Sequence, residues 1–147
     1  MKSLSATFKA LADETRLAML ALLFRHQELC VCDFVAVLSV SQSKASRHLR
    51  YLLNAGLLED RRAGAWVHYR IIERPEPGAR DVLSAVEQVL ARQNHEALEQ
   101  RFAQWSQEKR RSGSSCDSSQ LHGPAKATQR GANGTARTAR PPKGAGE

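Results

Sequence analysis

Two cysteines separated by one residue are the side chains best suited to chemistry in this chain. Cys30 and Cys32 offer thiolates, which are soft ligands and select soft, thiophilic ions. They stand at the start of a short apolar segment that reads as a helix, where the helix dipole favours an anion. Cysteine is also a common small buried residue, so a purely structural role for the pair stays open.

The spacing of the two cysteines bears on how one ion could reach both sulfurs. Residues i and i+2 of a helix point about 200° apart, so the two thiols do not face each other if both are helical. One ion can then hold both sulfurs only when the first helical turn unwinds. We therefore expect ion binding to distort this turn, which leads along the chain to a second helix near Ser41.

The second candidate site is the polar face of the helix predicted for residues 41–56. Ser41 is a good N-cap, as Asp13 is for an earlier predicted helix, and Gly56 stands where a left-handed C-terminal residue is wanted. Opposite the apolar stripe lie hydroxyls, an amide and cations, which can reach phosphates and base edges in a DNA major groove. We expect this helix to contact DNA through Ser41, Gln42, Ser43, Lys44, Ser46, Arg47, His48 and Arg50.

The segments that flank this helix predict the fold. A tight turn joins it to the short apolar segment of residues 30–38, which is the arrangement of a helix-turn-helix. Residues 57–62 and 66–71 then read as two strands around a glycine-containing turn, with Arg61 and Arg62 as cations for the DNA backbone. The sequence therefore predicts a mainly α fold with a small β-hairpin wing, a winged helix-turn-helix.

The net charge of +7 supports DNA as the partner. Residues 35–70 hold six basic and two acidic side chains, so positive charge in the folded part surrounds the polar-faced helix. This is the pattern expected where a polyanion binds. Residues 112–147 lack apolar periodicity and read as disordered. We expect a DNA-binding and dimerisation domain over residues 1–110 and a disordered basic tail over residues 111–147.

The stretch between the predicted wing and the tail indicates dimerisation. From Ala79 to about Lys109, apolar residues recur at helical spacing. A stripe this long, beyond a closed core, packs either on its own domain or on its copy in a second subunit. We favour the homodimer, because two DNA-contacting helices related by a two-fold axis bind two half-sites of double-stranded DNA.

Several function classes are disfavoured by the sequence. No apolar run approaches the roughly 20 residues of a membrane span, and the start lacks a signal-peptide pattern. We therefore expect a cytoplasmic protein with reduced thiols and no membrane partner. Three cysteines do not suggest a disulfide framework. Since phosphate loops and paired-carboxylate spacings are missing, we expect neither an enzyme nor an organic cofactor.

Four short motifs carry a family resemblance: residues 28–33 (Glu-Leu-Cys-Val-Cys-Asp), 41–49, 56–58 and 66–70 (Trp-Val-His-Tyr-Arg). Together they resemble the ArsR/SmtB family of metal-responsive repressors, and within it the arsenic-responsive branch, over roughly residues 1–108. The resemblance implies a homodimeric winged helix that represses transcription in arsenic resistance. It also implies release of operator DNA when trivalent arsenic or antimony, from arsenite or antimonite, binds cysteines in the first helix of the reading motif.

The resemblance gives the metal-ligand role to Cys30 and Cys32. The family pattern has a third cysteine where this chain has Val35. Because trivalent arsenic prefers three thiolates, Cys116 on a Gly/Ser-rich segment is a candidate third ligand. The alternative is that two protein sulfurs suffice with solvent or a small thiol. We expect Asp33 to orient or cap locally rather than to bind a soft ion.

Two other readings stay open. The first is a repressor of the same fold that responds to zinc, cadmium or redox state, with Asp81, His95 and Glu99 as candidate ligands. His95 and Glu99 share a helix face, but the paired histidines of such sites are missing. The second is a thiol oxidoreductase built on the Cys-Val-Cys motif, which lacks an active site of thioredoxin type.

Overall fold

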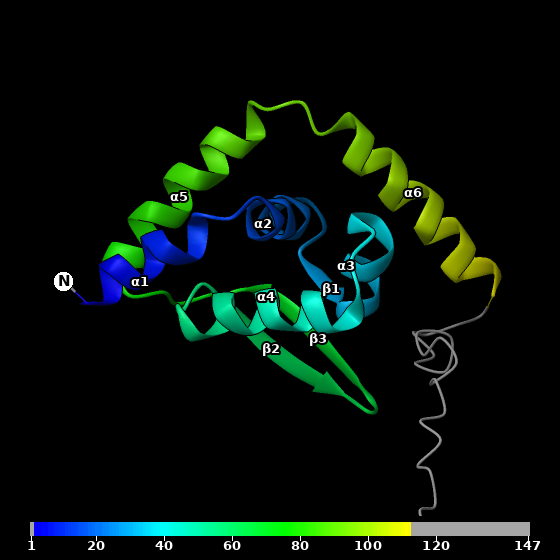
Figure 1. Ribbon diagram of the computed structural model, residues 1–147, viewed down its shortest axis with the longest axis horizontal. Coiled ribbons are helices and arrows are strands. Elements are labelled where there is room, and N and C mark those ends of the chain that lie inside the picture. The colour runs from blue at the N-terminus through cyan, green and yellow to red at the C-terminus, as the bar shows by residue number, and fades with distance from the viewer. Residues whose placement is uncertain (1, 113–147) are drawn as a thin grey trace, which may run out of the picture.

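The computed structural model describes residues 2–112 (Figure 1). It is mainly helical with a small antiparallel sheet, which confirms the predicted winged helix-turn-helix. The predicted tail and Cys116 lie outside the described residues, and no helix within them is long and apolar enough to cross a membrane. In chain order the elements are α1 (Lys2–Leu11), α2 (Glu14–His26), β1 (Glu28–Cys30), α3 (Val31–Leu38), α4 (Gln42–Asn54), β2 (Leu58–Ala63), β3 (Trp66–Ile71), α5 (Pro77–Ala91) and α6 (Glu96–Arg111).

The core lies where α2, α3 and α4 meet. The apolar stripe predicted for α4 points into it, and Ala45, Leu49 and Leu52 are fully buried while Leu53 is half-buried. Burying this stripe turns the polar face of α4 outward, where a ligand can reach it. The other large, fully buried side chains of the core are Phe34, Met19, Leu20, Leu22, Leu23, Leu57 and Val37.

Local capping fixes the ends of the helices around the helix-turn-helix. Asp13 accepts a hydrogen bond from the Arg16 amide at 2.9 Å and begins α2. The Ser41 hydroxyl accepts one from the Lys44 amide at 3.2 Å and begins α4. Gly56 has a φ of +68°, a conformation that glycine adopts without steric strain. All three caps were predicted from the sequence and are confirmed.

The sheet has one strand more than the predicted hairpin. The wing, defined here as β2 and β3, is an antiparallel pair in which Ala63 lies opposite Trp66. β1 adds to the free side of β3 and places Cys30 opposite His68, and the sequence did not predict this third strand. The pairing keeps Cys30 in extended backbone conformation immediately before α3.

The helix predicted to continue from Ala79 to Lys109 is divided in two, so this prediction is wrong. The break falls between α5 and α6, where the Asn94 side chain accepts a hydrogen bond from the Glu96 amide at 2.8 Å. Short polar side chains of this kind compete with helical backbone bonds. As a result the two helices form an arch, in which α5 lies against α1 and α6 returns to α3 (Figure 1).

Candidate functional site

The two cysteines of the predicted metal site meet at the junction of β1 and α3. The structure joins Cys30 and Cys32 in a disulfide, and the side chains are 1% and 4% exposed. The prediction that the sulfurs cannot face each other without unwinding a helical turn is wrong. Cys30 is the extended N-cap residue, so the helical rotation of 100° per residue does not separate it from Cys32. The disulfide also differs from the reduced pair expected from the sequence.

Asp33 lies beside this thiol pair and joins three parts of the fold. Its Oδ2 accepts a hydrogen bond from the Cys30 amide at 2.8 Å, which caps α3 as the sequence predicted. Its Oδ1 accepts two more, from the Trp105 indole at 2.8 Å and from the Lys109 ammonium at 2.8 Å. The carboxylate is thus satisfied on both oxygens although only 7% of its side chain is exposed.

The surroundings of the thiol pair come partly from the C-terminal helix. The Lys109 Nζ lies 3.6 Å from the Cys30 Sγ, and the indoles of Trp66 and Trp105 pack against the two cysteines. Sγ atoms of both cysteines and a carboxylate oxygen of Asp33 lie within 4.8 Å of one another. The site therefore offers two adjacent soft ligands, once reduced, beside two indoles and the Asp33–Lys109 ion pair.

The side chains of α4 that were predicted to contact DNA differ in solvent exposure. His48 turns inward, where its Nδ1 lies 3.5 Å from a carboxylate oxygen of Asp13 and 14% of its side chain is exposed. Burial lowers the pKa of His48 and outweighs the opposing effect of Asp13, so the ring is held neutral between α4 and α2. Gln42 and Ser46 are half-buried. The exposed members of the predicted set are Ser41, Ser43, Lys44, Arg47 and Arg50.

The cations of the wing differ in how far they are neutralised. Arg61 forms an ion pair with Glu28 of β1, and its hydrogen bond is the main cause that lowers the pKa of that carboxyl. Arg70 pairs with Glu59 at 2.6 Å. Arg62 is exposed and forms no ion pair with another residue of 2–112, which leaves its charge available to a phosphate.

Comparison with known proteins identifies the family. Residues 13–60 match the family described as "Bacterial regulatory protein, arsR family". The chain is 39% identical over 66 residues to an uncharacterized HTH-type transcriptional regulator of Methanocaldococcus jannaschii, and the match covers 45% of this chain and 74% of that protein. The chain belongs to the ArsR family.

Two further ArsR-family comparisons bear on function and fold. The arsenical resistance operon repressor of Escherichia coli K12 is 58% identical over 64 residues, which cover 44% of this chain and 55% of the relative. The chain spans about half the length of the arsenic-named relatives that it matches. HlyU from Vibrio cholerae superposes with a TM-score of 0.52 at 26% identity, over 62% of this chain and 95% of HlyU. The relatives of M. jannaschii and E. coli are named as a transcriptional regulator and a repressor, in agreement with the expectation that the chain is no enzyme.

Arg16 is a structural residue of this ArsR-family chain that its sequence did not reveal. Its guanidinium donates to the carbonyl oxygens of Ala10 and Lys9 at the end of α1, and it lies 4.4 Å from the centre of the Tyr51 ring of α4. The residue therefore ties α1 and α2 to α4. Because three separate segments meet there, no local sequence signal could have indicated the contact.

Proposed function

We propose that this ArsR-family protein is a homodimeric transcriptional repressor that releases operator DNA when trivalent arsenic or antimony binds Cys30 and Cys32. One observation carries the proposal. The thiol pair lies at the start of α3, and α3 is followed directly by α4, whose polar face is exposed. A chemical change at the sulfurs is therefore one short helix away from the surface that reads DNA.

The DNA-binding part of the proposal rests on the exposed side chains of α4 and the wing. Ser43, Lys44 and Arg47 occupy the first turns of α4, which in a helix-turn-helix is the part that contacts base edges. Arg50 and Arg62 supply exposed charge for the phosphate backbone.

The inducer chemistry begins with the disulfide. Two electrons from a cellular thiol reductant convert it into two thiols. Arsenous acid then exchanges two hydroxyl groups for the Cys30 and Cys32 sulfurs and releases two molecules of water. Val35, at the family's third cysteine position, is a partly buried core residue, so the remaining arsenic position goes to hydroxyl, to a small thiol or to Cys116.

Coupling follows from packing between the two helices of the reading motif. α3 and α4 share the core through Phe34, Val37 and Leu49, which are all 0% exposed. Close-packed side chains transmit a shift at the start of α3 rather than absorbing it. A hundredfold loss of operator affinity corresponds to about 2.7 kcal/mol, within the usual range of coupling between two sites.

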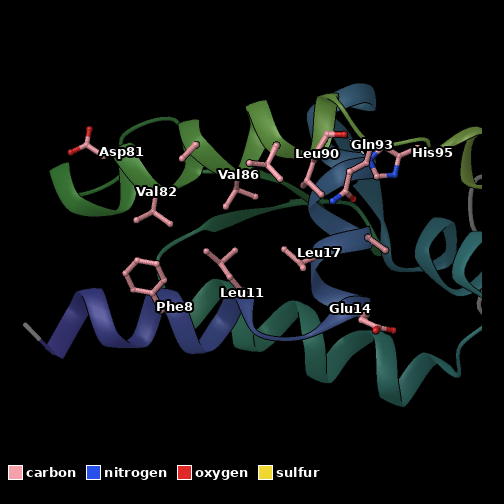
Figure 2. Close-up of a pocket in the computed structure, with 13 residues that line it drawn as sticks. Phe8, Leu11, Glu14, Leu17, Asp81, Val82, Val86, Leu90, Gln93 and His95 are labelled. Atoms are coloured by element: carbon pink, nitrogen blue, oxygen red, sulfur yellow. Dashed lines mark hydrogen bonds between the residues drawn. The ribbon is translucent and has the colours of Figure 1, made fainter.

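An exposed apolar groove between α1 and α5 supports a dimer interface at these helices (Figure 2). The groove has a volume of about 630 Å³, and Leu11, Val82 and Val86 line it. Phe8 and Val89 at its rim are each 56% exposed. A contiguous apolar surface of this kind marks an interaction site. The apolar stripe of α6, in contrast, packs on its own domain.

The test is operator binding measured by fluorescence anisotropy on the dyad-symmetric DNA upstream of the gene. We expect reduced wild-type protein to bind this duplex and to leave it when arsenite is added. Cys30→Ser and Cys32→Ser should bind DNA but ignore arsenite, and loss of release in Cys116→Ser would add that cysteine to the ligands. Normal release in the first two variants would exclude the thiol pair as the sensor.

A further inference from the structure

α6 packs beside the thiol pair and contributes Trp105 and Lys109 to its surroundings. No residue of α6 is fully buried, and the helix follows a break in the chain at residues 92–95. Its end is held near α3 by two hydrogen bonds to a single oxygen, Asp33 Oδ1, from Trp105 and from Lys109. A helix without a fully buried residue opens at a lower free energy than the core, so α6 can move while the core stays folded.

We propose that α6 is a cover over the thiol pair, held shut by Trp105 and Lys109 on Asp33, and that arsenic bound between the sulfurs opens it. This inference rests on the proposed function of Cys30 and Cys32 as the inducer site. Trp105 and Lys109 act in it as positioning residues, because they hold the Asp33 carboxylate and not the arsenic.

The direction of movement follows from what surrounds the sulfurs. Because both cysteines are buried, an arsenic atom with its third ligand can enter between the reduced sulfurs only if a neighbouring group moves. α3, which carries Cys32, is anchored by fully buried Phe34 in a close-packed core that resists compression. Of the groups that contact the sulfurs, Trp66 is held in the β2–β3 ladder, whereas Trp105 and Lys109 belong to α6, which has no fully buried residue. The displacement therefore falls on α6.

Opening the cover also changes the capping of α3. Asp33 caps the Cys30 amide with one oxygen while the other is fixed by Trp105 and Lys109. Once these two donors leave, the carboxylate is free to turn toward water, and the first turn of α3 loses its orienting group. The cover thus converts occupancy of the thiol pair into a change at the start of the reading motif.

The first experiment follows α6 directly in reduced full-length protein. The chain has two tryptophans, so a Trp66→Phe, Cys116→Ser protein keeps Trp105 as the fluorophore and the thiol pair as its thiols. On arsenite addition we expect loss of both titratable thiols, a red shift of Trp105 emission and at least a doubling of acrylamide quenching. Hydrogen exchange of residues 96–111 in wild-type protein should rise in parallel, which covers the case that the variant folds poorly.

The outcomes separate the two proposals. Loss of both thiols without any change in Trp105 emission or in exchange of residues 96–111 would overturn the cover and leave the inducer site standing. Thiols that stay fully titratable in arsenite would overturn the inducer site itself.

The second experiment uses the affinity for arsenite to measure how strongly Lys109 holds the cover shut. Because opening opposes binding, Lys109→Met should raise the affinity about tenfold, the effect of one lost charge-assisted hydrogen bond. Lys109→Arg should restore the wild-type affinity, and Arg110→Met, which removes an exposed charge from the same turn, should leave it unchanged. A lower affinity in Lys109→Met, or equal values in the two Met variants, would overturn the role of Lys109 in holding the cover.

Discussion

Replacing Asp33 with Asn tests how much this carboxylate contributes to the fold. The change keeps the shape of the side chain but removes its charge from bonds to the Cys30 amide, the Trp105 indole and the Lys109 ammonium. The bond to Lys109 contributes about 1–2 kcal/mol after allowance for the 28% exposure of that lysine. Weaker capping of α3 adds about 1 kcal/mol. We expect Asp33→Asn to lower the free energy of unfolding by about 2–3 kcal/mol.

The assay is urea denaturation of reduced protein, followed by circular dichroism, with Lys109→Met and the double variant in a thermodynamic cycle. The two single changes should be non-additive by about 1 kcal/mol, because both remove the same ion pair. Glu108→Gln, an exposed charge change beside Lys109, is the matched control and should alter stability by less than about 0.5 kcal/mol. An Asp33→Asn protein as stable as wild type would refute the assigned role of the carboxylate.

Three further predictions address DNA binding, pH and assembly. Arg47→Ala should weaken operator binding by about 1–3 kcal/mol and relax base preference, whereas Arg62→Ala should weaken all sequences alike; gel-shift titration on operator and scrambled DNA checks both. Because burial lowers the pKa of His48 below its ordinary 6.5, stability from the neutral ring is present above pH 6.5 and is lost as the pH falls through the lowered pKa. His48→Gln should flatten the stability profile in that window, measured by thermal melts from pH 7.5 to 5. Val89→Asp should shift the protein from dimer to monomer in analytical ultracentrifugation, and an unchanged dimer would move the interface away from the α1–α5 groove.

Features set by neighbouring residues could be predicted from the sequence, and features set by distant ones could not. The caps at Asp13 and Ser41 and the positive φ of Gly56 depend on a few adjacent residues, and each was predicted. The two sulfurs lie together because Cys30 belongs to β1, and β1 forms only because β3 lies beside it. An argument from helical geometry alone therefore failed.

The part of the site contributed by α6 illustrates the same limit. Asp33 and Lys109 are 76 residues apart, and the contact exists because the chain breaks between α5 and α6 and returns to α3. The apolar periodicity of the segment continues across the break, so it predicted one long helix. A polar Gln-Asn-His run at residues 93–95 was the available signal for the break.

The strand that the sequence did not predict, β1, gives the proposed sensor a second route to the proposed DNA surface. β1 carries Cys30 at one end and Glu28 at the other, and Glu28 holds the wing's Arg61 through an ion pair. A phosphate and Glu28 compete for the same guanidinium, so the strand's position sets how much of that cation DNA can use. A shift of β1 on arsenic binding would change the attraction between Arg61 and the DNA phosphates. A shift of α3 would at the same time change the contacts of α4 with the bases. Adding the inducer should therefore change both the affinity for operator DNA and the salt dependence of that affinity.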